Sequence, residues 1–120
     1  MNLAEIQKTL EADVVVGSDL EHVDIEVICA ADLMSDVLAL ARSGALLLTG
    51  LTNAQVIHTA DVADLRAICI VRGKKPDEET VRAAESRNVP LLATNLTMFE
   101  CCGRLYREGL PGVQIDSNNL

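Results

Sequence analysis

Residues 67–93, AICIVRGKKPDEETVRAAESRNVPLLA, contain the pattern that decides the fold. The two ends, AICIV and VPLLA, are short, apolar and rich in branched side chains, which is typical of buried strands. The segment between them opens with Pro76, carries three acids in its first turn and ends at Asn88, a residue that suits a left-handed helix cap. The stretch therefore predicts a strand, a helix and a second strand parallel to the first.

A further helix follows this unit directly. TNLT leads into it, and Thr97 and Glu100 have the spacing of a capping box, in which two side chains satisfy the first free amides of a helix. We expect this helix to run to Glu108 and Gly109 to end it. The tail that follows, PGVQIDSNNL, is polar, and we expect it to fray.

The middle of the chain holds shorter segments. ALLL at 45–48 is wholly apolar, which predicts a buried strand, and it runs into the turn-rich loop TGLTN at 49–53. QVIHTA at 55–60 fits a further strand, and DVADL at 61–65 fits a single helical turn.

The first part of the chain adds two helices and two strands. Asn2 suits the cap of a helix that has Leu3, Ile6 and Leu10 on one face. Strands are expected in DVVVG and IEVICA, with the acidic connector SDLEHVD between them. ADLMSDVLALARSG then repeats apolar residues at helical spacing, and Gly44 stands where a C-terminal cap belongs.

This order of elements predicts the fold class. Strands that alternate with helices through short loops indicate a mostly parallel sheet flanked by helices and built from βαβ units. Hydrophobic residues make up 49% of the 120 residues, yet there is one Phe, one Tyr and no Trp, so the core is aliphatic. We expect residues 1–120 to form a single α/β domain, because no linker or repeat divides them.

The charge of the chain argues against two classes of partner. Acidic residues number 18 against 10 basic ones, and the net charge of −8 repels phosphate backbones and anionic membranes. No apolar run approaches the roughly 18 residues of a membrane span, and the N-terminus lacks the pattern of a signal peptide. We therefore expect no nucleic-acid or membrane partner, a cytoplasmic location and reduced cysteines.

The four cysteines do not have the spacing of a metal site. Cys29 and Cys69 lie alone in apolar strands, and Cys101 and Cys102 are adjacent in a helix, where neighbouring side chains point about 100° apart. We expect Cys29, Cys69 and one of the adjacent pair to be small core residues. A redox role for the exposed member of the pair is the alternative.

No catalytic residue, metal site or cofactor is predicted. His22 lies in the acidic connector and His58 within QVIHTA, and neither has a partner at the spacing of a ligand or catalytic motif. Nucleophile-elbow, Walker A and GxGxxG patterns are absent, and RGKK lacks both the leading glycine and the following hydroxyl of a phosphate loop.

One group of residues converges if the strands are parallel. The loops TGLTN, RGKK and TNLT would then leave the carboxyl ends of strands, the edge where open α/β sheets bind ligands. Helix N-termini there attract anions. The alternative is that these residues only cap helices and form turns. The expected ligand residues are Thr49, Asn53, Arg72, Lys74, Lys75, Thr94, Asn95 and Thr97.

From about residue 25 to 108 the chain resembles the DRTGG domain. The resemblance rests on the order of elements and on the segments TGLTN, PDEE and TNLTMFE. Of the residues that give the family its name, Asp61 and Gly73 match, whereas Val71 and Arg72 stand where Thr-Gly is expected.

The resemblance implies a regulatory role. DRTGG domains accompany CBS domains, phosphotransacetylases and pyrophosphatases, and they look like the N-terminal, non-catalytic domain of HPr kinase. Stand-alone versions occur near hydrogenase and redox operons. We therefore expect a non-catalytic, homodimeric regulatory domain that senses a nucleotide or phosphorylated metabolite. An adaptor for a redox enzyme is the first alternative, and a small kinase is the second.

Overall fold

Residues 67–93 fold as predicted in the computed structural model, which describes residues 1–114. Strand β4 (Ala67–Ile70), helix α4 (Glu78–Arg87) and strand β5 (Leu91–Ala93) follow one another, and the two strands pair in parallel. Pro76 does not open the helix, because Asp77 is the N-cap and accepts a hydrogen bond of 2.8 Å from the Thr80 amide.

Within residues 1–114, the sheet has five strands in the order β1-β5-β4-β3-β2. Strands β2 (Ile28–Ala30), β3 (Leu46–Thr49), β4 and β5 are parallel to their neighbours, and β1 (Asp13–Val16) pairs antiparallel with β5. The predicted fold class, a mostly parallel sheet flanked by helices, is confirmed.

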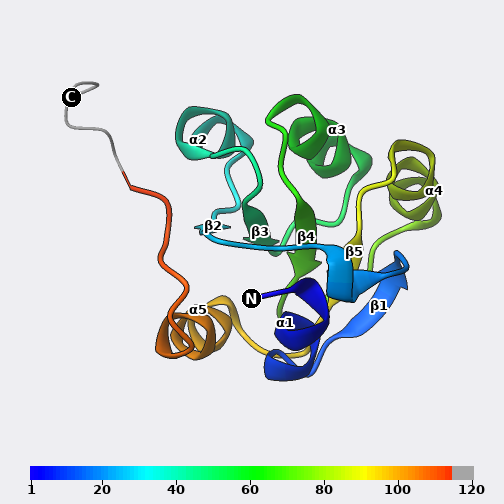
Figure 1. Ribbon diagram of the computed structural model, residues 1–120. Coiled ribbons are helices and arrows are strands. Elements are labelled where there is room, and N and C mark those ends of the chain that lie inside the picture. Colours follow the sequence, from blue (N-terminus) through cyan, green and yellow to red (C-terminus); the bar gives the residue numbers. More distant parts are fainter. Residues whose placement is uncertain (115–120) are drawn as a thin grey trace.

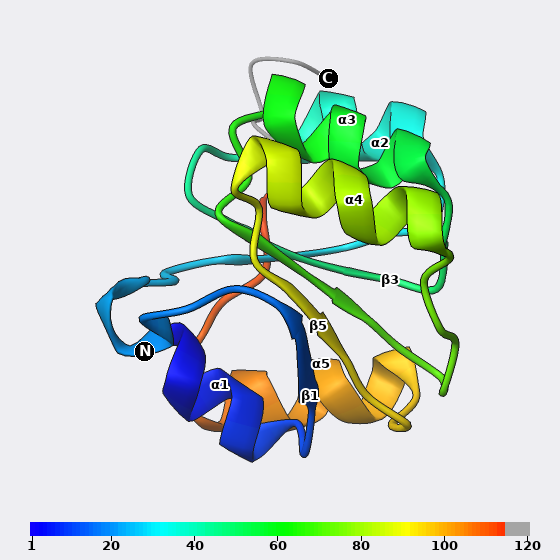
Figure 2. The same ribbon diagram turned by 90° about the vertical axis from the view of Figure 1, so that its right-hand side faces the viewer.

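Two layers of helices cover the sheet (Figures 1 and 2). Helices α2 (Met34–Leu40), α3 (Ala54–Val62) and α4 lie side by side on one face, and α1 (Leu3–Thr9) and α5 (Met98–Arg107) cover the other. The short 3-10 turn η1 (Leu20–His22) packs beside α1.

The strand sequences explain the two cores, because successive side chains of a strand point to opposite faces. Ala67, Cys69 and Val71 belong to the core under α1 and α5. Ile68 and Ile70 belong to the core under α2, α3 and α4. Each face of β4 is therefore covered, which accounts for a strand that is apolar at every position.

The predicted helix ends are largely confirmed. Asn2 and Glu5 form a reciprocal capping box at 2.9 and 3.1 Å. At Thr97 only half of the predicted box forms: the Thr97 hydroxyl accepts a bond of 3.3 Å from the Glu100 amide, whereas the Glu100 side chain binds Arg104. Asn88 has the left-handed conformation, with φ +56°, as its type allows. Gly109 has φ +98°, and it follows the C-cap of α5.

Two predictions in the middle of the chain were wrong. QVIHTA is not a strand and DVADL is not a separate turn, because both segments contribute to α3. The buried residues Val56, Ile57 and Ala60 have helical spacing and pack against the sheet, so this burial outweighs the preference of branched side chains for strands.

Two other elements are shorter than predicted. Helix α2 stops at Leu40, since Ala41 has an extended backbone, and Gly44 (φ +82°) lies in the turn before β3 instead of capping the helix. Only the last three residues of IEVICA form strand β2.

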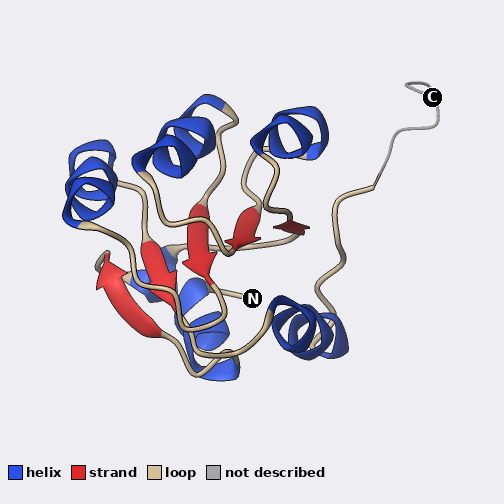
Figure 3. Ribbon diagram, turned by 180° about the vertical axis from the view of Figure 1, so that it is seen from behind, coloured by secondary structure: helices blue, strands red, loops and turns tan. Residues whose placement is uncertain are grey.

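The chain after α5 lies along the free side of β2 (Figure 3). The Ile28 amide donates to the Pro111 carbonyl at 2.9 Å, and the Val113 amide donates to the Ile28 carbonyl at 2.8 Å. The predicted polar tail falls largely on residues 115–120, outside the described residues. Over residues 1–114, the helices are all too short or too polar to cross a membrane.

Candidate functional site

The predicted site lies at the carboxyl edge of the sheet. Because β3, β4 and β5 are parallel neighbours, the loops that follow them leave the sheet side by side. Backbone bonds tie the loops together: the Val71 amide donates to the Thr49 carbonyl at 2.9 Å, and the Gly73 amide donates to the Thr94 carbonyl at 2.9 Å. The three loops therefore form one connected surface.

The loop after β4 turns outward through two residues in the left-handed conformation. Arg72 has φ +66° and Gly73 has φ +71°. A β-carbon on Gly73 would lie 3.2 Å from Oδ1 of Asn95, so the glycine allows the Asn95 side chain to lie against the loop. A β-carbon on Gly50 would lie 2.5 Å from the Arg72 guanidinium, so the arginine side chain covers Gly50.

The three predicted threonines all have bonds within the chain. Thr49 is fully buried and donates to Asp32 at 3.0 Å, whereas Thr94 is 4% exposed and donates to the Leu10 carbonyl at 2.6 Å. Thr97 caps α5 through its side-chain oxygen. These hydroxyls hold the edge in shape, as the alternative reading of caps and turns requires.

Asp32 was missed by the sequence reasoning, which placed it at the start of a helix. It follows β2, and its Oδ1 accepts bonds from the Thr49 hydroxyl and, at 2.7 Å, from the Gly50 amide. The carboxylate thereby links the loops after β2 and β3. Its position directly after a strand was the signal that could have identified it.

A cavity of about 310 Å³ opens at this edge, between the loop after β4 and strand β1. Four of the predicted residues line it: Lys74, Lys75, Thr94 and Asn95. The other four, Thr49, Asn53, Arg72 and Thr97, lie outside it. Two acids that the sequence reasoning missed complete the polar lining, Glu11 and Asp13, and Val15, Pro76 and Val81 supply apolar surface.

The basic side chains of the edge are free to bind. Arg72, Lys74 and Lys75 are exposed, and none of them forms an ion pair with another residue in 1–114. The side-chain amides of Asn53 and Asn95 likewise have no hydrogen-bond partner in that part of the chain, and Asn53 caps α3 without a side-chain bond. The cations and amides, in contrast to the threonines, have bonding capacity left for a ligand.

The cysteines are packing residues. Cys29, Cys69 and Cys101 are buried and Cys102 is half-buried, as expected for three core residues and one more accessible thiol. Burial raises the pKa of all four thiols, that of Cys101 to about 11, so the thiols stay protonated at neutral pH. Among the described residues, no three His, Cys, Asp or Glu side chains gather where they could hold a metal ion.

Neither histidine contributes to the edge. His58 is exposed on α3, and His22 is exposed on η1, where it lies 3.8 Å from Glu21.

The sequence matches the family model of the DRTGG domain over residues 5–107. The chain belongs to the DRTGG domain family. Among curated proteins, no match to the sequence was found.

A solved structure with a similar fold contains the CBS and DRTGG domains of the regulatory region of Clostridium perfringens pyrophosphatase, complexed with its activator diadenosine tetraphosphate. The TM-score is 0.73 at 20% sequence identity, over 99% of this chain and 52% of the other. This DRTGG domain thus spans about half the length of that chain. The likeness shows the fold.

Asp61, Gly73 and Val71, the positions that the sequence analysis compared with the name-giving residues of the family, have structural roles here. Asp61 lies at the end of α3 and binds Arg87 of α4 at 2.6 Å, which joins two helices on the same face. Gly73 forms the left-handed turn beside Asn95. Val71 is buried in the core under α1 and α5, where a threonine would have to find a hydrogen-bond partner.

Proposed function

We propose that this DRTGG domain is a non-catalytic regulatory module that binds a nucleotide or another phosphorylated metabolite at the carboxyl edge of its sheet. The observation that supports this most directly is the cavity between Lys74 and Lys75 on one side and Glu11 and Asp13 on the other. The lysines attract phosphate, and the carboxylates accept hydrogen bonds from hydroxyl and amino groups. A nucleotide carries both kinds of group, whereas inorganic phosphate carries only the first.

The size and lining of the cavity fit this ligand class. Its volume of about 310 Å³ is at the lower end of small-molecule sites, which span roughly 300–1,000 Å³. Val15, Pro76 and Val81 offer an apolar surface for a base, although no aromatic residue is present for stacking. Because both lysines are exposed, we expect modest affinity that weakens with salt.

The similar structure supports the same class of ligand. The regulatory region of the Clostridium perfringens pyrophosphatase is complexed with a nucleotide activator, and one of its two kinds of domain is DRTGG. We propose that this chain shares the regulatory role and that it acts in the cytoplasm.

A thermal-shift titration tests the proposal. Wild type is compared with Lys74→Ala/Lys75→Ala in AMP, ADP, ATP, diadenosine tetraphosphate and inorganic phosphate. We expect one or more nucleotides to raise the melting temperature and the double variant to lose most of that shift. Lys8→Ala, an exposed lysine of α1 outside the cavity lining, is the matched control and should keep the full shift.

Two results would contradict this reading. A shift that survives in Lys74→Ala/Lys75→Ala places the ligand elsewhere, and a broad nucleotide screen that leaves the wild type unchanged removes the ligand. Phosphate transfer from labelled ATP to HPr would favour the kinase alternative.

A second candidate function is an adaptor, in which the domain self-associates and also contacts a redox enzyme. The observation that favours a macromolecular contact is α5, which exposes Phe99 and Tyr106. Among the apolar side chains of α5, Phe99 is available for such a contact, whereas Leu105 is fully buried and Met98 packs against the core. Co-purification with a redox enzyme from the native cells would support this role.

A further inference from the structure

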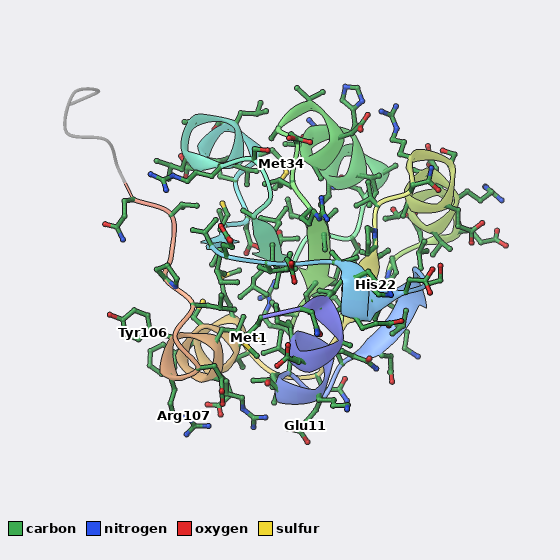
Figure 4. All side chains as sticks on the ribbon, viewed as in Figure 1. Met1, Glu11, His22, Met34, Tyr106 and Arg107 are labelled. Carbon is green, nitrogen blue, oxygen red and sulfur yellow. The ribbon has the colours of Figure 1, made fainter. Side chains whose placement is uncertain are left out.

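Helix α5 packs one side against the sheet and exposes two aromatic side chains. Cys101 and Leu105 are fully buried beneath the helix. Phe99 and Tyr106, the only two aromatic residues of the chain, are 86% and 74% exposed. Figure 4 shows Tyr106 and Arg107 projecting outward from α5. Both aromatic side chains of this chain therefore lie outside its core.

A glycine lies between the two aromatic residues. Gly103 is in the middle of α5, where glycine costs about 1 kcal/mol relative to alanine. A β-carbon at this position would meet no atom of the described residues within 4 Å, so packing within residues 1–114 does not require a glycine. Its backbone φ is outside the left-handed range, so conformation does not require one either. Close approach of a second backbone is a physical reason for a glycine at this position.

An apolar groove runs beside this face. It has a volume of about 680 Å³ and lies between α5, strand β2 and the segment after α5. Leu40, Leu110 and Val113 are among its apolar lining residues, and Phe99, Cys102 and Tyr106 form the α5 side. The exposed aromatic face therefore continues into a concave apolar surface.

The surface around Gly103 is complementary to the same surface on a second copy of the chain. Two copies of the helix can pack antiparallel about a two-fold axis at Gly103. A residue of one copy then lies opposite the residue of the other copy whose number, added to its own, gives about 206. At about 100° per residue, Phe99 and Tyr106 lie on one side of Gly103, and Glu100 and Arg107 lie on the other. The two-fold axis keeps each side of one helix next to the same side of the other. Phe99 of each copy therefore meets Tyr106 of the other copy, and Glu100 of each copy meets Arg107 of the other copy.

We propose that this protein forms a two-fold symmetric dimer in which α5 packs antiparallel against α5 of a second copy, with the helices crossing at Gly103. This dimer rests on the proposed self-association but not on the proposed ligand. The aromatic pairs then cover the grooves of both copies, and such an isologous contact closes on itself.

The charges favour a second copy over another partner. Arg107 has no ion pair within residues 1–114, and Glu100 uses one oxygen, Oε1, to bind Arg104 at 3.0 Å. The second oxygen of Glu100 is thus available to Arg107 of the other copy. A single helix pair with its groove buries less than the roughly 800 Å² per partner of a standard interface, so we expect a dissociation constant in the micromolar range.

Gly103→Leu is the first test, by sedimentation velocity over a concentration series. The leucine blocks the crossing, and we expect a monomer at concentrations where the wild type is dimeric. Because the site of the new side chain is open and leucine favours helix, the variant should melt no lower than wild type at dilute concentration. Val62→Ala, which removes an exposed apolar side chain from α3, is the control and should leave the dimer intact.

The charge pair offers a second test. Arg107→Glu should weaken the dimer about tenfold, because it places two like charges together at each end of the contact. Glu100→Arg/Arg107→Glu should recover most of that loss by exchanging the two charges. A double variant as weak as the single one would contradict the pairing.

Cys102 gives a covalent readout. It lies one residue from the axis, near its counterpart, and it is the most accessible thiol of the chain. A short bis-maleimide should therefore link two chains in wild type and leave Cys102→Ser uncrosslinked. A wild type that stays monomeric at about 100 μM overturns the proposal, as does a dimer that persists in Gly103→Leu. In both cases the change in melting temperature on adding nucleotide still tests the proposed ligand site at Lys74 and Lys75 independently.

Discussion

Replacing Thr94 with valine separates two roles for the carboxyl edge, namely holding its shape and binding a ligand. Thr94 is 4% exposed, and its hydroxyl donates to the Leu10 carbonyl at 2.6 Å and accepts from the Leu96 amide at 3.2 Å. Valine has nearly the same shape but can make neither bond. If the Thr94 hydroxyl has a structural role, removing it should lower the free energy of unfolding even when no ligand is present.

The size of the loss follows from these two bonds. Leu10 is fully buried, and leaving its carbonyl without a donor costs about 1–3 kcal/mol. The Leu96 amide is partly exposed and regains water, so its bond adds about 0.5 kcal/mol. The new methyl group returns less than about 0.8 kcal/mol through burial. We therefore expect a destabilisation of about 2 kcal/mol, or about 6–10 °C in melting temperature for a domain of this size.

Urea unfolding followed by circular dichroism measures this difference. Thr9→Val is the matched control, because it makes the same change in α1 at a half-buried hydroxyl that has no bond within residues 1–114, and it should cost less than about 0.5 kcal/mol. If Thr94→Val and Thr9→Val unfold at the same urea concentration, the structural role of the Thr94 hydroxyl is wrong.

Three further predictions concern stability. Asn88→Ala should cost about 1 kcal/mol because the residue has φ +56°, whereas Asn88→Gly should be nearly neutral; thermal melts of both variants decide. Hydrogen bonds from Thr80 hold the pKa of Asp77 below its usual value, so the carboxylate stabilises the fold above about pH 4 and loses this effect as the pH falls through the lowered pKa. In urea midpoints between pH 3 and pH 7, wild type should accordingly exceed Asp77→Asn at neutral pH, and the gap should close in acid; a gap independent of pH would contradict this. Cys69→Ala should cost about 1–2 kcal/mol through lost packing in a fully buried position, and an unchanged urea midpoint would show that the thiol does not pack as described.

The parts of the fold that local chemistry specifies were predictable from sequence. The βαβ unit at 67–93 has a run of apolar residues on either side of an acidic helix start and an Asn cap, and each signal acts within a few residues. The same holds for the caps at Asn2 and Thr97. These features depend on interactions between residues that are close in the sequence, so the spacing of residue types predicts them.

Sequence spacing was a poor guide where contacts between distant parts of the chain determine the local structure. QVIHTA has branched residues that suit a strand, and only its burial against the sheet makes it part of α3. The expected ligand residues were chosen by type, and spacing along the sequence does not reveal that the Thr94 hydroxyl binds the Leu10 carbonyl or that the Thr49 hydroxyl binds Asp32. Asp32 was overlooked because its partners, Thr49 and Gly50, belong to another strand and its loop.

The reversed direction of β1 has the largest effect on the candidate site. A fifth parallel strand would bring its carboxyl end to this edge, but β1 is antiparallel and brings its amino end, with Glu11 and Asp13, to face the lysines after β4. Opposite charges across one cavity disfavour a bare phosphate, which the carboxylates repel, relative to a ligand that also donates hydrogen bonds. If this is correct, Asp13→Asn should raise the affinity for inorganic phosphate relative to nucleotides, since it removes the repulsion and keeps a polar group. Competition of phosphate against the best nucleotide in the thermal-shift assay measures that ratio, and a ratio unchanged by the substitution would show that β1 does not select the ligand.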